Sequence, residues 1–213
     1  YNMVPIGLVL KMVIGNSDKF LKKNDKLTVA KKTKKKFFKL NPEQTDALKF
    51  LEKIDNKFEV SVLQGTTGSG KTLVYFERIK KIIENKNQAL VLLPEIFLTN
   101  DFKTRFEDFF GFQPAIWHSK ITPKQKRIIW KGLISDKIKI LVGARSALLL
   151  PFKKLGIIIV DEEHDASYKQ DEGVIYNARD MAISRAYFEN IPVHLVSSVP
   201  SIAVSYTHLR AHE

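Results

Sequence analysis

Two short motifs in this sequence carry residues that can bind and hydrolyse a nucleotide. Residues 65–72 read G-T-T-G-S-G-K-T, and residues 157–164 read I-I-I-V-D-E-E-H. The first has the spacing of a phosphate-binding loop, a glycine-rich turn between a strand and a helix. The second is an apolar strand ending in carboxylates, which can hold a metal ion and activate water. Together they predict a nucleotide hydrolase, and the D-E-E-H ending favours a helicase or a translocase.

The residue types of the glycine-rich loop suit the binding of phosphate. Gly65, Gly68 and Gly70 allow the backbone to form a nest of N–H groups around the β-phosphate. The N-terminus of the following helix adds a favourable dipole. We expect Lys71 to reach the β- and γ-phosphate oxygens and the Thr72 hydroxyl to bind Mg²⁺.

Asp161 and Glu162 are the candidate catalytic carboxylates, and Lys71 is the third candidate catalytic residue. Asp161, at the end of its strand, is expected to hold Mg²⁺ together with Thr72. Glu162 is placed to orient and deprotonate the attacking water. His164 is a candidate bridge between the γ-phosphate site and the loop that follows it.

Gln44 is a candidate for recognition of adenine. It lies in L-N-P-E-Q, 21 residues before the first glycine of the loop. A glutamine amide can pair with both edges of adenine; an exposed position on a helix is the alternative. The predicted ATP-binding set is therefore Gln44, Gly65, Thr66, Thr67, Gly68, Ser69, Gly70, Lys71 and Thr72.

A second group of residues is suited to nucleic acid. The segment G-A-R-S-A at residues 143–147 follows an apolar strand and offers a cation and a hydroxyl to the phosphates of single-stranded DNA. A polar, aromatic loop at 165–176 follows the carboxylates, and its rings can stack on bases. Surface packing without DNA contact is the alternative for both. The predicted DNA-binding residues are Arg145, Ser146, Tyr168, Lys169 and Tyr176.

The elements that must position these residues alternate between strand and helix. Apolar runs without polar residues are typical of strands covered on both faces, and the alternation predicts a doubly wound, mostly parallel α/β sheet with helices on both faces. Ligands of such folds bind at the carboxyl ends of strands, where both motifs fall. Strands are expected at 60–63, 89–93, 114–117, 138–142, 156–160 and 193–196, and helices at 42–54, 71–84, 99–110, 122–133 and 178–188.

Composition limits the remaining possibilities. The 213 residues contain no cysteine, which excludes disulfides and cysteine-ligated zinc within this chain. No run of 18 apolar residues is present, so no membrane-spanning helix is expected. The net charge of +12 is concentrated in residues 1–40, where 11 lysines face two aspartates. Such an arm fits a polyanionic partner, with a solvated linker as the alternative. Because the chain begins with Tyr1, we expect it to be part of a longer protein.

Six segments of the sequence resemble the PriA family, the superfamily 2 helicases (primosomal protein N′) that restart bacterial replication forks. The most specific is D-E-E-H-D-x-S-Y-K-Q at 161–170. The others are L-Q-G-T-T-G-S-G-K-T-x-V-Y (63–75), L-L-P-E-I-x-L-T (92–99), H-S (118–119), G-A-R-S-A-L-x-x-P-F (143–152) and Y-N-A-R-D-M-A (176–182). The resemblance covers about residues 40–201.

This resemblance implies a RecA-like P-loop NTPase lobe of a cytoplasmic, ATP- and Mg²⁺-dependent 3′→5′ DNA helicase. Its partners would be single-stranded and forked DNA, primosome proteins and single-strand-binding protein, with no membrane involved. Residues 1–39 would be the tail of an upstream DNA-binding region with a lysine-rich linker, residues 40–204 the helicase lobe, and residues 205–213 a non-native-looking or frayed tail. Arg179 and Asp180 would help to seat the loop at 165–176.

Some features depart from the family pattern. Val199 stands where the family has a threonine that links hydrolysis to movement, and the second lobe with its arginine finger lies outside these residues. An arginine finger contributes roughly 10³–10⁵ in rate in related NTPases. We therefore expect weak nucleotide binding and very slow turnover by this chain alone. The alternatives are another superfamily 2 translocase and a nucleotide- or DNA-binding fragment without turnover.

Overall fold

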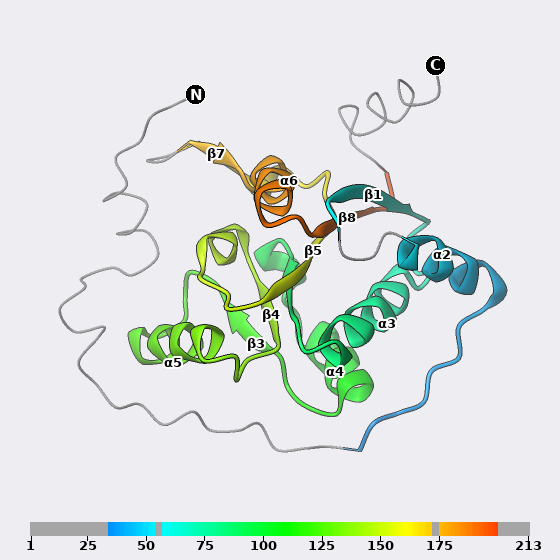
Figure 1. The fold of residues 1–213 in the computed structure, drawn as a ribbon, viewed down its shortest axis with the longest axis horizontal. Helices are drawn as coiled ribbons and strands as arrows, with labels where there is room; N and C mark the ends of the chain where they lie inside the picture. Colours follow the sequence, from blue (N-terminus) through cyan, green and yellow to red (C-terminus); the bar gives the residue numbers. More distant parts are fainter. Residues whose placement is uncertain (1–33, 54–56, 172–174, 200–213) are drawn as a thin grey trace.

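A six-stranded parallel sheet forms the centre of the molecule, with strand order β1-β8-β5-β2-β4-β3. The computed structural model describes residues 34–53, 57–171 and 175–199; the lysine-rich segment before residue 34 and the C-terminal tail lie outside them. The sheet strands are β1 (Glu59–Gln64), β2 (Gln88–Leu92), β3 (Ala115–Trp117), β4 (Ile140–Gly143), β5 (Leu155–Asp161) and β8 (Pro192–Ser197). The predicted fold class is confirmed (Figure 1).

Burial explains why these strands are nearly uniformly apolar. Every residue of β2, β4, β5 and β8 is buried, as expected for central strands covered on both faces. Parallel pairing fixes the register at their ends: Asp161 of β5 lies opposite Val196 of β8, and Gln64 of β1 lies opposite Ser197. The ends of β1, β5 and β8 therefore meet at one edge of the sheet.

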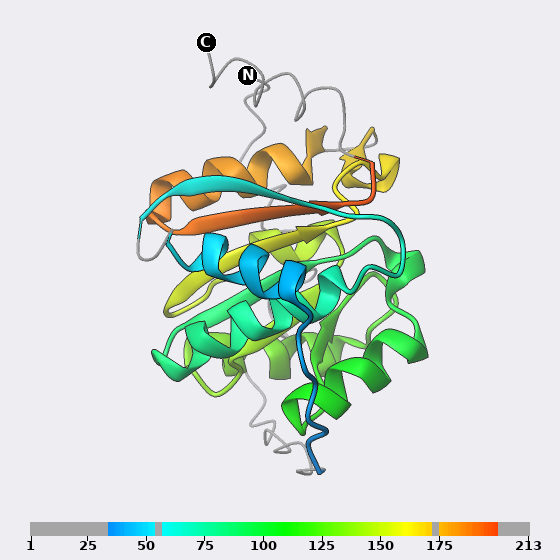
Figure 2. The same ribbon diagram turned by 90° about the vertical axis from the view of Figure 1, so that its right-hand side faces the viewer.

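The described residues form the α-helices α2 (Pro42–Glu52), α3 (Lys71–Glu84), α4 (Asn100–Phe110), α5 (Pro123–Ile134) and α6 (Ala178–Glu189), and α3 to α6 cover the two faces of the sheet. The apolar residues of α3 and α4 share one core cluster, and those of α5 and α6 share the other. Helix α2 packs outside the sheet layer, against α3 (Figures 1 and 2). No helix within the described residues is long and apolar enough to span a membrane.

Local signals set the starts of the helices. Asn41 caps α2 in a reciprocal capping box with Gln44, and Pro42 occupies the first turn. Thr122 and Gln125 form the same arrangement at α5, and the Thr99 side chain caps α4. These caps satisfy N–H groups that have no partner within the helix. They explain why helix starts predicted from the sequence agree closely with the structure.

The packed domain begins before the predicted boundary at residue 40. Lys36 pairs with Asp108 of α4 at 2.8 Å, and the ring of Phe38 stacks on Phe109 at a centroid distance of 6.0 Å. Residues 36–39, assigned to the linker from the sequence, therefore lie along α4.

A short antiparallel hairpin was not predicted. Strands β6 (Lys169–Gln170) and β7 (Tyr176–Asn177) pair where we expected an open loop. The two strands are too short to show a periodic pattern of side chains.

Candidate active site

The glycine-rich loop connects β1 to α3. Gly68 and Gly70 both have φ values of +82°, a left-handed conformation that residues with a side chain rarely adopt. The Gly65 amide donates to the Ser197 carbonyl at 3.2 Å, and the Ser69 amide donates to the Thr66 carbonyl at 3.1 Å. These bonds fold the loop over the first turn of α3. The free N–H groups of that turn and the helix dipole then favour an anion at this position.

Lys71, the first residue of α3, folds back over this loop. Its Nζ donates to the Gly65 carbonyl at 2.6 Å and to the Thr66 carbonyl at 3.1 Å. The ammonium is thus held beside the backbone nest that the sequence predicts for phosphate. Thr67 lines the same cavity.

Gln44 has a second role that the sequence did not reveal. Its Nε2 donates to the Ser69 carbonyl at 2.9 Å, and its Oε1 accepts from the Asn41 amide at 3.0 Å. One side chain therefore caps α2 and holds the phosphate-binding loop against that helix. Recognition of adenine by Gln44 stays a prediction, because these two bonds use one N–H of Nε2 and one lone pair of Oε1 and leave the others.

Asp161 lies at the end of β5 with 7% of its surface exposed. Its Oδ2 accepts from the Tyr75 hydroxyl at 2.9 Å, and its Oδ1 accepts from the Glu162 amide at 3.0 Å. Burial disfavours the charged carboxylate and raises the pKa of Asp161 to about 6, although the Tyr75 hydrogen bond opposes this shift. A nearby cation would stabilise a carboxylate whose charged form is disfavoured by burial. The environment of Asp161 is therefore suited to a metal ligand.

Glu162 adopts a strained backbone conformation. Its φ value is +50°, which is uncommon for a residue with a side chain, and such strain clusters at functional sites. Glu162 lines the same cavity as Asp161 and Lys71, and its Oε2 lies 3.7 Å from Nδ1 of His164. This conformation turns the side chains of Glu162 and Glu163 to different sides of the chain. Glu162 faces the cavity, whereas Glu163 is buried and pairs with Arg179 at 3.3 Å.

His164 and Arg179 both bond to residues at or near the carboxylate motif. His164 Nδ1 lies 2.7 Å from the Ser197 hydroxyl at the end of β8. Arg179 bonds to Asp180 and to Glu163 of the motif. These bonds help to hold the carboxylate turn, residues 161–164, and the predicted roles of both side chains toward the loop at 165–176 stay predictions.

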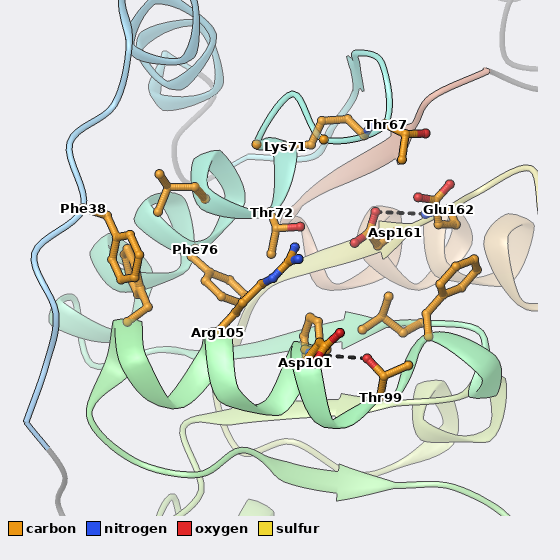
Figure 3. Close-up of a pocket in the computed structure, with 17 residues that line it drawn as sticks. Phe38, Thr67, Lys71, Thr72, Phe76, Thr99, Asp101, Arg105, Asp161 and Glu162 are labelled. Atoms are coloured by element: carbon orange, nitrogen blue, oxygen red, sulfur yellow. Dashed lines mark hydrogen bonds between the residues drawn. The ribbon is translucent and has the colours of Figure 1, made fainter.

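A cavity of about 490 Å³ brings the loop and the carboxylates together (Figure 3). Lys71, Thr72, Asp161 and Glu162 line one side of it, and helix α4 lines the other. Exposed Arg105 extends from α4 toward Thr72 and Asp161 in Figure 3. Arg105 was not predicted as a site residue, because its only signal in the sequence is a cation on the helix that follows β2.

A second cavity, of about 550 Å³, lies at the ends of β2, β3 and β4. The predicted residues Arg145 and Ser146 line it, together with Lys126, His118 and Ser119. Arg145 Nη1 donates to the carbonyls of Ser167 and Lys169 at 3.0 and 2.6 Å. The guanidinium thus links the G-A-R-S-A segment to the loop after the carboxylates.

The prediction that Tyr168 and Tyr176 stack on DNA bases is wrong for this conformation. Tyr168 is 2% exposed, and the single proton of its hydroxyl is shared between the carbonyl oxygens of Leu92, at 3.0 Å, and Asp161, at 2.5 Å. Tyr176 is 8% exposed and belongs to the same core cluster. Both rings pack in the core because their apolar faces gain more from burial than from water. Lys169 remains exposed and pairs with Asp171 at 2.9 Å.

The fold and this site define a RecA-like P-loop NTPase lobe of the helicase type. The chain belongs to the family described as "Type III restriction enzyme, res subunit", whose model matches residues 37–191.

Curated relatives confirm the predicted resemblance to PriA. The chain is 46% identical over 167 residues to "Replication restart protein PriA" of Rickettsia felis, covering 78% of this chain and 25% of that protein. It is 45% identical over 164 residues to the PriA of Helicobacter pylori strain J99, covering 77% and 26%. For the PriA of Bacillus subtilis the identity is 42% over 147 residues, covering 69% and 18%. The chain thus spans about a quarter of the length of these relatives.

Solved structures confirm the fold. The DUF1998 helicase MrfA gives a TM-score of 0.55 at 20% identity, covering 82% of this chain and 29% of that one. The Hef helicase domain of Pyrococcus furiosus gives 0.52 at 16% identity, covering 75% and 32%.

Proposed function

We propose that this chain is the first motor lobe of an ATP-dependent DNA helicase that acts in replication restart. The observation that carries the proposal is the cavity in which the phosphate-binding loop faces Asp161 and Glu162, the second of which has a strained backbone. A phosphate chain bound at the start of α3 would lie beside both carboxylates. The similarity to PriA proteins supports the restart role over another translocase.

The residues present fit ATP with Mg²⁺. Lys71 and the N–H groups at the start of α3 would bind the phosphates, while the Thr72 hydroxyl and the buried Asp161 carboxylate supply oxygen ligands, which Mg²⁺ prefers. When bound, the metal neutralises negative charge on the phosphate oxygens. Glu162 lies next to Asp161 and lines the cavity, where it would orient a water molecule and accept its proton.

DNA is proposed to bind along the second cavity. Lys126, Arg145 and Ser146 line it. Exposed Lys169 of β6 lies in the sequence between Tyr168 and Gln170, which also line this cavity. Such cations and hydroxyls bind the phosphate backbone without reading the sequence. Arg145 donates to the Ser167 carbonyl, and the hydroxyl of the neighbouring Tyr168 bonds to the Asp161 carbonyl. These two hydrogen bonds connect the proposed DNA surface to the end of β5.

The remaining parts of the proposal concern the longer protein. Movement in the 3′→5′ direction, forked DNA, the primosome, single-strand-binding protein and a cytoplasmic location come from the resemblance to PriA. The helicase lobe, predicted at residues 40–204, is proposed to begin at residue 36 because Lys36 pairs with Asp108 of α4. The lysine-rich segment at 16–39 is proposed as an additional DNA contact.

The first test is ATP hydrolysis with and without single-stranded DNA. It should be measured for this chain and for a version extended to the length of the PriA relatives, each beside a Glu162→Gln variant. We expect DNA-stimulated turnover in the longer protein, its loss in the variant, and turnover by this chain that is lower by roughly 10³ or more. Absence of turnover in the longer protein would overturn the proposal and favour a binding module.

A further inference from the structure

Tyr75 is the most deeply buried polar side chain beside the candidate metal ligands. It lies on α3, three residues after Thr72, and its exposed fraction is 0%. Its hydroxyl donates to Oδ2 of Asp161 at 2.9 Å. Burial raises the pKa of Tyr75, and the nearby Thr72 side chain opposes this rise as a hydrogen-bond partner. One phenol therefore bonds to Asp161 and lies near Thr72, the two side chains that the proposed function assigns to Mg²⁺.

The core itself gives no reason for a hydroxyl at this position. The neighbouring residue on α3, Phe76, is 1% exposed, and its ring lies 5.2 Å from the Tyr75 ring in an edge-to-face contact. A phenylalanine at position 75 would preserve this packing. Burying a hydroxyl costs free energy unless the hydroxyl is hydrogen-bonded. The bond to Asp161 explains why a hydroxyl is present at this position.

The hydroxyls of Thr72 and Tyr75 each carry one proton, which limits each of them to one donated hydrogen bond. A threonine hydroxyl that binds a metal through an oxygen lone pair keeps its proton and needs an acceptor for it. Tyr75 has one proton, which it gives to Asp161, so its oxygen remains an acceptor for Thr72. A hydrogen-bond order from Thr72 through Tyr75 to Asp161 would leave the lone pairs of the Thr72 oxygen for the cation.

We propose that Tyr75 is a positioning residue of the magnesium site, orienting the Thr72 hydroxyl and the Asp161 carboxylate together. This inference rests on the proposed ATP- and Mg²⁺-dependent function and adds a residue to it. Groups that orient metal ligands in this way typically change metal affinity by about 10- to 100-fold when removed. The variant Tyr75→Phe keeps the ring and removes only the hydroxyl.

The test measures binding of a fluorescent ADP analogue to this chain as Mg²⁺ is titrated, and again in EDTA. For Tyr75→Phe we expect the Mg²⁺ concentration at half-maximal binding to rise about 10- to 100-fold. Affinity in EDTA should stay within about twofold of the unmodified chain, because Tyr75 is not among the residues lining the cavity. Tyr187→Phe is the matched control, since Tyr187 is 63% exposed and lies far along the chain on α6.

A double variant separates positioning from a general loss of packing. If Tyr75 acts through Thr72, Tyr75→Phe should add little to the Mg²⁺ defect of Thr72→Val, because contacting residues are not additive. Equal Mg²⁺ titrations for Tyr75→Phe and Tyr187→Phe would overturn the inference while leaving the proposed function intact. An equal loss of affinity in EDTA and in Mg²⁺ would also overturn it. Absence of Mg²⁺-dependent binding in the unmodified chain would overturn both.

Discussion

Nδ1 of His164 and the hydroxyl of Ser197 lie 2.7 Å apart, although 33 residues separate them in the chain. The Ser197 oxygen also accepts from the Val199 amide at 3.1 Å. One hydroxyl thus joins the carboxylate turn after β5 to the segment that follows β8.

Ser197→Ala should lower the free energy of unfolding by about 1 kcal/mol, because a buried hydroxyl and its two partners lose their bonds. The midpoint of urea denaturation would measure this loss. Ser184→Ala on exposed α6, which removes only a bond to the Asp180 carbonyl, is the control. A loss no larger than that of the control would show that the contact between His164 and Ser197 does not stabilise the fold.

The raised pKa of Asp161 predicts a specific pH dependence. Burial raises its folded-state pKa to about 6, well above the ordinary value of an aspartate, so the folded protein binds the proton more tightly. Stability contributed by this group is therefore present below about pH 4 and is lost as the pH rises to about 6. In metal-free buffer, Asp161→Asn should gain about 1 to 3 kcal/mol relative to the unmodified chain across this range.

The pH dependence of stability has to be compared between variants, because a buried histidine, His194, changes it in the direction opposite to Asp161. Burial lowers the pKa of His194 to about 3, so its contribution to stability is lost as the pH falls below about 6.5. Urea midpoints at pH 4.5 and 7 for Asp161→Asn should be compared with those for Asp46→Asn, an exposed carboxylate on α2. Equal changes in the urea midpoints of the two variants between pH 4.5 and 7 would contradict the raised pKa of Asp161.

Arg105 is predicted to contact the bound nucleotide. It lines the cavity and extends toward Thr72 and Asp161 in Figure 3. A charge-assisted hydrogen bond contributes about 1.5–3 kcal/mol, so Arg105→Ala should weaken ATP binding at least about tenfold. Lys103→Ala on the same helix is the control. Equal binding isotherms for the two variants would place Arg105 outside the nucleotide site.

Tyr168 is predicted to act through its buried hydroxyl and not by stacking on bases. Tyr168→Phe leaves the Leu92 and Asp161 carbonyls without this donor and should cost about 1–3 kcal/mol of stability, measured by urea denaturation beside Tyr187→Phe. Affinity for single-stranded DNA should not change. A stacking ring would give a different pattern, in which Tyr168→Phe is neutral in stability and in DNA affinity.

The sequence was sufficient to predict the strands, the helices and the phosphate-binding loop, since each depends on local signals. Helix α3 begins at Lys71 and ends at Glu84 as expected, because a glycine-rich loop precedes it and its apolar residues recur at helical spacing. The positions of the two motifs at one edge of the sheet follow from parallel strand pairing.

Side-chain partners across the sheet could not be predicted in the same way. A tyrosine in a polar loop can face solvent or core, and no periodicity distinguishes the two, so Tyr168 was assigned to DNA. The bond between Tyr75 and Asp161 joins residues 86 positions apart, which local patterns do not encode. Gln44 shows the same limit: its helix-capping signal was visible, but its bond to the loop at Ser69 was not.

The contacts around Asp161 also have a consequence for the order of folding. Its carboxylate and carbonyl are held by Tyr75 and Tyr168, and the second of these also reaches Leu92, 76 residues away. Contacts between residues so distant in sequence form late, after their loops have closed. Helices α3 and α4 can therefore form while the carboxylate is still unsupported. Refolding followed by far-ultraviolet circular dichroism should accordingly run ahead of the recovery of nucleotide binding.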